Sequence, residues 1–318
     1  MAESVMMRKA YGEALVRLGA THPQVVALSG DVSNSDFSYL FQEAYPDRFY
    51  NVGIAEQSLV DVAAGLAYAG KIPFANTFAF LFATRALEMV RTHLCYGRAN
   101  VKLMATYAGV SDSFDGPTHH AITDIAILRS LPNMTVIVPS DSVAVAKLLP
   151  QVADWDGPVY FRLCRNEVPV LFDDTYDPRI GKAVAVRDGS DLTLVGTGVL
   201  LHRCLQAADL LAGEGISARV LEIHTIKPID QDALLAAAGE TGALVTVEEH
   251  TVLGGLGGAV AEVIGGELPV PVVRVGISDV FAESGPYQDL LDRYGMSLDH
   301  ILKAAHKALV LKKHAYAV

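Results

Sequence analysis

A glutamate at the start of an Ala- and Gly-rich helical pattern is the first residue in this sequence that could carry chemistry. Glu56 follows a short segment in which Gly53 closes a turn, and it opens the predicted helix 57–69. A carboxylate in the first turn interacts favourably with the helix dipole, by roughly a few tenths of a kcal/mol. A buried carboxyl is also a common group for proton transfer. The position of Glu56 alone favours a structural role, in which it stabilises the start of the helix.

A loop rich in turn-forming residues holds the second set of candidates. Residues 109–121 read GVSDSFDGPTHHA, and they include Asp115 and the adjacent histidines His119 and His120. A surface turn with one hydrogen-bonded histidine is the plain interpretation. A metal site is the alternative, but neighbouring residues rarely converge on one ion, and no Glu-x-x-His or second histidine pair accompanies them. The spacing therefore argues against a metal site.

Aromatic and cationic residues complete the candidates in the first half. Phe78, Phe80 and Phe82 recur at every second position, so they would share one face of a strand but spread around a helix. Arg162 and Arg165 end a predicted strand in a segment too apolar to be a solvated charge run. A structural salt bridge is one interpretation of these arginines.

A glycine-rich segment in the second half suggests a dinucleotide site. His250 begins HTVLGGLGGAV, in which four glycines open a helix after a strand. The segment lacks the full Gly-x-Gly-x-x-Gly order and an acidic residue at the end of a following strand. We assign it no catalytic residue.

Alternating strand and helix patterns must position these residues, as expected for βαβ units. The first series predicts strands at 24–28, 101–105, 136–138 and 159–163, and helices at 57–69, 85–96 and 142–152. The second predicts strands at 192–195, 219–223, 244–247 and 270–275, and helices at 200–212 and 259–264. Between them the pattern fails in a stretch with prolines, glycines and acidic residues. We expect an α/β fold with a first domain at 1–170, a linker at 171–189 and a second domain at 190–318, each domain having a mainly parallel sheet flanked by helices.

Composition narrows the class of protein. The chain has 318 residues, which exceeds the size at which one core usually stops growing, and 51% of them are hydrophobic. A net charge of -11 without a basic run argues against nucleic acid as a partner. The three cysteines form no Cys-x-x-Cys pair. No apolar run has the pattern of a signal peptide or a membrane span, so we expect a cytoplasmic protein without a membrane partner.

The segment NVGIAEQ, residues 51–57, resembles the pyrimidine-domain motif of thiamine-dependent transketolases and deoxyxylulose-phosphate synthases. The resemblance covers nearly the whole chain and continues in the family's order through Thr77-Phe78, Asp115-Gly116-Pro117-Thr118-His119, Leu131-Pro132-Asn133-Met134 and Pro139-Ser140-Asp141. It implies a thiamine-diphosphate pyrimidine-binding fold followed by a transketolase C-terminal fold. The latter is mainly structural and dimer-forming in the family.

The resemblance also implies which residues contact the cofactor. Glu56 would hydrogen-bond N1′ of the aminopyrimidine and so favour the imino tautomer that removes the proton from thiazolium C2. Phe78 and either Phe80 or Phe82 would stack on the ring, where offset stacking contributes roughly a kcal/mol beyond buried area. Asp31, in a segment after the first strand, would touch the cofactor as well.

Other matched positions imply substrate contacts. By resemblance, His119 would be catalytic with Glu56 and would contact the donor's hydroxyls or its carbonyl-derived oxygen, while Asp115 would bind a substrate hydroxyl. Arg165 matches an arginine on the sugar phosphate, and a guanidinium fork suits that dianion. We group Arg162 with it. His120 stands where the motif usually has glutamine, and we expect it behind the contacting residues.

One position departs from the family's pattern. Tyr107 lies where many transketolases have a phosphate-contacting histidine. A changed phosphate site would suit a different ketose phosphate, such as the branched sugar of apulose-phosphate transketolases, which are also encoded as two chains.

The magnesium motif of the family is missing from this sequence. Thiamine enzymes bind the diphosphate through Mg²⁺, using a Gly-Asp-Gly triplet and a downstream asparagine. The chain contains no Gly-Asp-Gly. We therefore expect the diphosphate and Mg²⁺ on a second, N-terminal-type subunit, most simply in an α2β2 heterotetramer with two-fold symmetry.

The sequence thus predicts the C-terminal subunit of a transketolase that moves a two-carbon ketol unit from a ketose phosphate to an aldose phosphate. A β subunit of a two-oxoacid dehydrogenase and a deoxyxylulose-phosphate-synthase-like enzyme are alternatives with the same architecture. The Asp115–His119 motif argues against the first, and a separate chain argues against the second. A non-catalytic scaffold or regulatory subunit is the alternative from another class, and intact Glu56, His119 and Arg165 argue against it.

Overall fold

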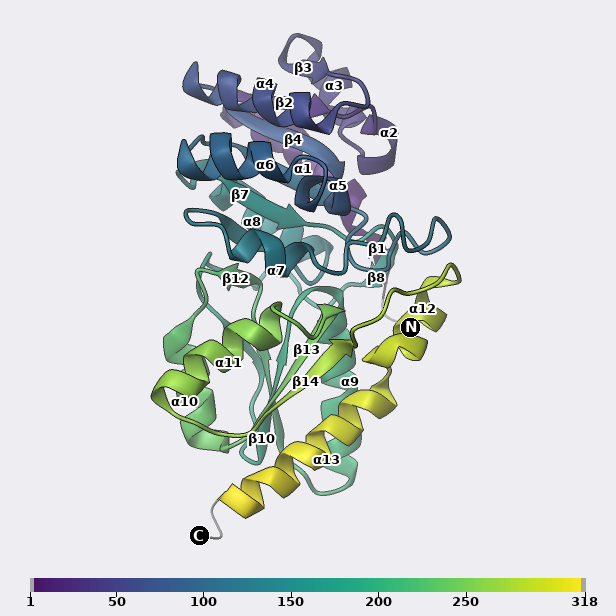
Figure 1. Ribbon diagram of the computed structural model, residues 1–318, viewed down its shortest axis with the longest axis vertical. Helices are drawn as coiled ribbons and strands as arrows, with labels where there is room; N and C mark the ends of the chain where they lie inside the picture. Colours follow the sequence, from purple (N-terminus) through teal and green to yellow (C-terminus); the bar gives the residue numbers. More distant parts are fainter. Residues whose placement is uncertain (1–2, 316–318) are drawn as a thin grey trace.

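Short runs of Val, Leu and Ala form the central strands of two sheets, because residues on both faces of these strands are buried. The computed structural model describes residues 3–315. In it the two sheets lie one above the other along the long axis, the first in the purple-to-teal half and the second in the green half (Figure 1). The predicted α/β class, with mainly parallel sheets flanked by helices, is confirmed.

The first sheet has seven strands within the described residues, and all neighbours run parallel except at one edge. That edge strand comes from the second half of the chain and pairs antiparallel, so it links the two halves. Across the sheet the strands are β12 (Thr225–Lys227), β6 (Thr135–Ile137), β7 (Val159–Arg162), β5 (Lys102–Thr106), β4 (Ile72–Phe78), β2 (Val25–Ser29) and β3 (Phe49–Asn51).

Helices pack on both faces of this sheet. They are α1 (Met7–Thr21), α2 (Ser33–Asp36), α3 (Tyr39–Ala44), α4 (Glu56–Tyr68), α5 (Ala79–Ala83), α6 (Leu87–Met89), α7 (Asp124–Arg129) and α8 (Ser142–Asp154). The predicted helix 85–96 is divided between α6 and a π-helical segment, η2 (Val90–Tyr96). A two-stranded ribbon of β1 (Ser4–Met6) and β8 (Glu167–Pro169) and a 3₁₀ turn, η1 (Pro46–Arg48), complete this half.

Across the second sheet the strands are β14 (Val272–Ile277), β13 (Leu244–Thr251), β10 (Leu192–Gly196), β11 (Ala218–Glu222) and the antiparallel β9 (Val184–Arg187). β9 lies inside the segment expected to be a linker. The helices are α9 (Leu201–Gly213), α10 (Gln231–Thr241), α11 (Leu256–Glu267), α12 (Tyr287–Leu291) and α13 (Leu298–Ala315), with the short turns η3 (Gly198–Leu200) and η4 (Asp292–Met296). The long yellow helix α13 runs down one side of this sheet (Figure 1).

The parallel order of the first sheet brings the candidate functional residues together at the carboxyl ends of its strands. Strands β2, β3, β4, β5 and β7 all point the same way, so the residues that follow them meet at their carboxyl ends. In open α/β sheets ligands bind at the carboxyl ends of the strands. Within residues 3–315 no helix is long and apolar enough to cross a membrane.

Candidate active site

Glu56 is buried at the start of α4, immediately beyond β3. The chain turns there because Asn51 Oδ1 accepts a hydrogen bond of 2.9 Å from the Gly53 amide, and Gly53 takes a φ of +76°. Only 3% of Glu56 is exposed, and its Oε2 has no hydrogen-bond partner among residues 3–315. A buried carboxylate oxygen without a partner is costly, by about 1–3 kcal/mol. It is therefore a place where a ligand's hydrogen-bond donor fits.

The three phenylalanines do not share a face, because β4 ends at Phe78 and α5 begins at the next residue. The Phe78 ring lies 4.3 Å from the Tyr107 ring, and the Phe80 ring lies 5.0 Å from the His119 ring, measured between centroids. Phe82 is different, since it points into the core and is 0% exposed. We therefore withdraw Phe82 as a cofactor contact, whereas Phe78 and Phe80 remain candidates.

Asp31 follows β2 at the same edge. Its backbone takes a φ of +65°, which is uncommon for a residue other than glycine, and its carboxylate accepts a hydrogen bond of 2.8 Å from Asn51 Nδ2. Asp31 is exposed. The structure thus connects Asp31 to the turn that precedes Glu56.

The loop 107–122 follows β5 and holds Asp115, His119 and His120. Asp115 is exposed and His119 is half-buried, with its Nδ1 3.0 Å from Thr118 Oγ1. His120 is buried, which lowers the pKa of its imidazole, and neither ring nitrogen has a hydrogen-bond partner in the described part of the chain. Across residues 3–315 no cluster of three or more His, Cys, Asp or Glu side chains is arranged to hold a metal ion.

Asp112 is a member of this site that the sequence motifs did not single out. Its carboxylate lies 2.7 Å from Arg165 Nη1, and Asp115 lies 3.6 Å from the same nitrogen. Burial, together with the neighbouring Asp115 carboxylate, raises the pKa of Asp112 to about 7. The visible signal was the repetition of Asp three residues apart in SDSFD, which places both carboxylates in one turn.

Arg8 is the second unexpected member, and its guanidinium group, like that of Arg165, lies beside the Tyr107 ring. Each guanidinium carbon lies 4.9 Å from the centroid of that ring. Arg8 Nε donates to the Arg165 carbonyl at 3.0 Å, and Nη1 donates to the Tyr107 hydroxyl at 3.2 Å and to the Ser35 carbonyl. Both guanidinium groups therefore make cation–π contacts with the same aromatic ring. The sequence signal was an arginine within an otherwise apolar face of α1.

Arg162 does not reach this site, and our grouping of it with Arg165 is wrong. Only 5% of Arg162 is exposed, and its Nε donates to Asp124 Oδ2 at 2.7 Å. Burial opposes its charge, but Asp124 and Glu249 outweigh that effect, so the pKa of Arg162 lies above its usual range. Arg162 is the last residue of the buried strand β7, whereas Arg165 lies three residues beyond its end, with a side chain that is 34% exposed.

Comparison with known proteins places the chain in a family. Residues 3–170 match the family model of the transketolase pyrimidine-binding domain, and residues 181–301 match that of the transketolase C-terminal domain. A putative transketolase C-terminal section from Methanocaldococcus jannaschii is 41% identical over 93% of this chain and 94% of its own length. A 6-deoxy-6-sulfo-D-fructose transketolase subunit from Clostridium sp. is 38% identical over 96% of this chain and 95% of its own length.

Longer relatives and a solved structure agree with this assignment. Rat transketolase is 40% identical over 98% of this chain, but the match covers only 50% of the rat protein. A solved split-gene transketolase, described as an inactive β4 tetramer, superposes with a TM-score of 0.92 at 47% identity, covering 97% of this chain and 99% of that one. The chain therefore belongs to the transketolase family of thiamine-diphosphate-dependent enzymes, and it corresponds to that family's C-terminal section.

Proposed function

We propose that this chain forms the pyrimidine side of a thiamine diphosphate site and that, with a second subunit, it transfers a two-carbon ketol unit from a ketose phosphate to an aldose phosphate. The observation that carries this proposal is the buried Glu56 Oε2, which has no hydrogen-bond partner within residues 3–315. It lies at the sheet edge where Phe80 packs on His119.

The residues at this edge fit the cofactor. Bound thiamine diphosphate would supply the carbon nucleophile and the electron sink for cleavage of a carbon–carbon bond. Glu56 would hold a proton at N1′ of the aminopyrimidine. Phe78 and Phe80 would contact the ring and exclude water from it, and Asp31 would support the turn that presents Glu56.

Polar side chains of the loop and of β7 suit a sugar phosphate. His119 would hydrogen-bond the donor's hydroxyls and carbonyl oxygen, and Asp115 would accept from a hydroxyl. Arg165 would bind a tetrahedral anion at the far end of the sugar, and the buried Arg8, which bonds the Arg165 carbonyl, would add positive charge behind it. Phosphate and sulfonate share this chemistry, so a relative named for a sulfonated fructose fits the same site.

A second subunit would complete the enzyme. Two relatives that match over nearly their full length are named as a section or a subunit of a transketolase, and the chain spans half of the rat protein. The partner would hold the diphosphate and Mg²⁺, in a cytoplasmic α2β2 assembly. Within this chain we propose domains at 1–170 and 190–318, joined by residues 171–189.

The test is reconstitution. The chain would be assayed alone and mixed with a co-encoded chain that carries Gly-Asp-Gly, with thiamine diphosphate and Mg²⁺, on ketose and aldose phosphates, a 6-sulfo ketose and their uncharged analogues. We expect ketol transfer only in the mixture, in a 1:1 complex by light scattering. Full activity of the isolated chain, or of the mixture with Glu56→Ala, would contradict the proposal.

A further inference from the structure

The loop 107–122, which carries Asp115 and His119, is held by the second domain at three points. Val110 N donates to Glu249 Oε1 at 2.8 Å, and Thr251 N donates to the Ile122 carbonyl at 2.8 Å. Near the middle of the loop, Gly285 N donates to the Ser113 carbonyl at 3.1 Å. Two of these points lie on β13 or its end, and the third precedes α12. The second domain therefore determines where the loop sits.

Of these three contacts only the one to Val110 uses a side chain, that of Glu249. Each oxygen of its carboxyl group accepts a hydrogen bond. Glu249 is 3% exposed, and its Oε2 accepts a hydrogen bond of 3.0 Å from the Tyr287 hydroxyl. On the loop side, Gly109 has a φ of +62°, and a Cβ there would lie 2.3 Å from Glu249 Cδ. Glycine at 109 thus lets the carboxyl group pack directly against the loop's backbone.

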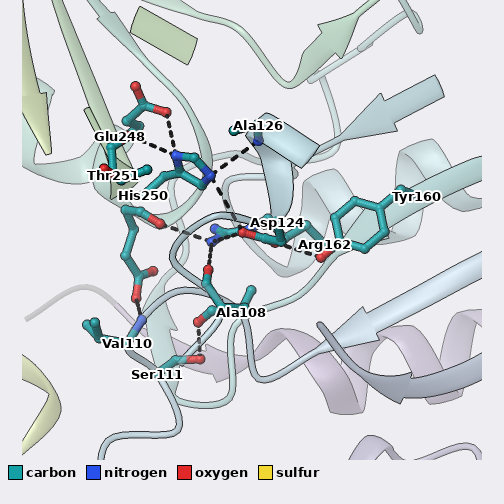
Figure 2. A network of polar contacts seen from close by, with 12 residues as sticks. Ala108, Val110, Ser111, Asp124, Ala126, Tyr160, Arg162, Glu248, His250 and Thr251 are labelled. Atoms are coloured by element: carbon teal, nitrogen blue, oxygen red, sulfur yellow. Dashed lines mark hydrogen bonds and ion pairs between the residues drawn. The ribbon is translucent and has the colours of Figure 1, made fainter. Parts of the chain in front are cut away.

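A buried ion pair fixes the backbone beneath the same contact. Arg162 Nη2 donates to the Ala121 carbonyl and to the Glu249 carbonyl, each at 3.0 Å. Its partner Asp124 also accepts a hydrogen bond of 2.6 Å from the Tyr160 hydroxyl. Figure 2 shows Arg162 and Asp124 between the loop residues Val110 and Ser111 on one side and His250 of the second domain on the other.

Ser111, the next residue in the loop, links Val110 to the residues proposed to bind substrate. Ser111 Oγ accepts a hydrogen bond of 3.2 Å from Arg165 N, and the Ser111 carbonyl accepts one of 3.0 Å from Asn166 Nδ2. Arg165 in turn lies 2.7 Å from Asp112. A displaced Val110 therefore changes the position of Arg165 and of the turn that holds Asp115.

We propose that Glu249 of the second domain is a positioning residue for the donor substrate, because its carboxyl group holds Val110 and so places Asp115, His119 and Arg165. The proposal rests on the transketolase function proposed above. It gives the C-terminal domain a part in substrate binding in addition to its structural role.

Hydrogen–deuterium exchange of the isolated chain tests the contact without any need for activity. Glu249→Ala should raise the exchange rate of amides in residues 107–122 by about tenfold, while β2, β4 and β5 keep their protection. Glu249→Gln should restore most of it, since its amide oxygen accepts from Val110 and its NH₂ donates to Tyr287. Glu240→Gln, on the same domain but paired with Arg219 at the surface, is the control and should change nothing in the loop.

Tyr287→Phe keeps the test decisive if Glu249→Ala lowers the melting temperature too far for measurement. The variant removes one hydroxyl and leaves the ring, so the chain should stay folded while loop exchange rises about threefold. Wild-type exchange of residues 107–122 in both Glu249→Ala and Tyr287→Phe would overturn the proposal.

Kinetics of the reconstituted complex test the positioning role itself. Glu249→Ala should raise KM for the donor about tenfold and change the Kd of thiamine diphosphate much less, because the loop carries the donor contacts and Glu56 lies on another element. Glu249→Gln should recover most of the donor KM. A loop that exchanges faster without a change in donor KM would overturn the positioning claim, whereas an inactive wild-type mixture would instead count against the proposed function.

Discussion

The Arg85 guanidinium lies 3.8 Å from the Glu56 carboxylate, which is an ion-pair distance but too long for a hydrogen bond. Arg85 is 61% exposed and Glu56 only 3%. The carboxylate is therefore partly compensated in charge, while Oε2 stays free, among the described residues, to bond a ligand. Removing this side chain breaks no hydrogen bond among the described residues and relieves the cost of the unpaired oxygen, so it should not lower stability.

Glu56→Gln and Glu56→Ala should accordingly separate activity from stability. We expect kcat of the reconstituted enzyme to fall by at least about 100-fold, the lower range for loss of an acid–base group, and the melting temperature of the chain not to fall. Steady-state assays and thermal unfolding measure the two effects. Glu88→Gln, at an exposed glutamate of α6 that accepts a hydrogen bond from Thr92, is the matched control and should keep full activity. An active Glu56→Ala would remove this residue from the mechanism.

Substitutions at Phe80 and Phe82 should have different effects, one on cofactor binding and the other on stability. Phe82→Ala leaves a cavity in the core and should lower the free energy of unfolding by about 3–5 kcal/mol. Phe80→Ala should cost much less stability but weaken thiamine diphosphate binding by roughly tenfold, since loss of an aromatic contact is worth about a kcal/mol. Denaturant unfolding and cofactor titration of the complex check these values. Equal cofactor affinity in Phe80→Ala and wild type would place Phe80 outside the site.

The residues of this site show which features could be predicted from the sequence. Glu56, Phe78 and His119 were predicted through their resemblance to family motifs, each of which occupies one short segment of the sequence. Phe80 and Phe82 could not be separated, since the answer depends on the residue at which β4 ends and α5 begins. The predicted parallel strands likewise followed from apolar runs that are legible locally.

Contacts between distant segments were the part that no local pattern revealed. Arg8 meets Arg165 from 157 positions away, and Glu249 meets Val110 from 139. Arg162 and Arg165 looked alike in the sequence and each pairs with a buried aspartate, but the Arg162 side chain is 5% exposed and that of Arg165 is 34% exposed. Buried polar groups are satisfied by whichever partner the tertiary fold supplies, so their partners are not encoded by spacing.

Arg165→Lys should weaken binding of charged donors selectively. Lysine keeps the charge but loses the fork and the stacking on Tyr107, so we expect KM for a phosphorylated donor to rise by about tenfold. The kcat/KM for an uncharged analogue of the same sugar should stay within about twofold. Arg179→Lys, at an exposed pair with Asp177, is the control. A parallel loss with both donors would show that Arg165 supports the loop rather than the anion.

A buried carboxyl group between the two domains should make stability depend on pH. Glu222 on β11 is 0% exposed, and it accepts hydrogen bonds of 2.6 Å from Ser140 of the first domain and from Tyr176 of the connecting segment. Burial raises the pKa of Glu222 to about 7, although these two hydrogen bonds oppose the shift. The folded chain then keeps a proton that the unfolded chain releases above its ordinary value of 4.5. Stability should therefore fall as pH rises from 4.5 to about 7 and stay at the lower level above it.

Glu222→Gln removes this ionisation while its amide can still bond Ser140 and Tyr176. Relative to the parent chain, we expect the variant's melting temperature to be similar near pH 5 and higher near pH 8, by an amount that corresponds to a free energy on the order of 1–3 kcal/mol. The difference at each pH is the informative quantity, because Asp36, Asp112 and Glu249 also have raised pKa values and contribute to both curves. Glu240→Gln should run parallel to the parent at every pH. A constant offset for Glu222→Gln would mean that Glu222 ionises equally in the folded and unfolded chains, and that its hydrogen bonds compensate fully for its burial.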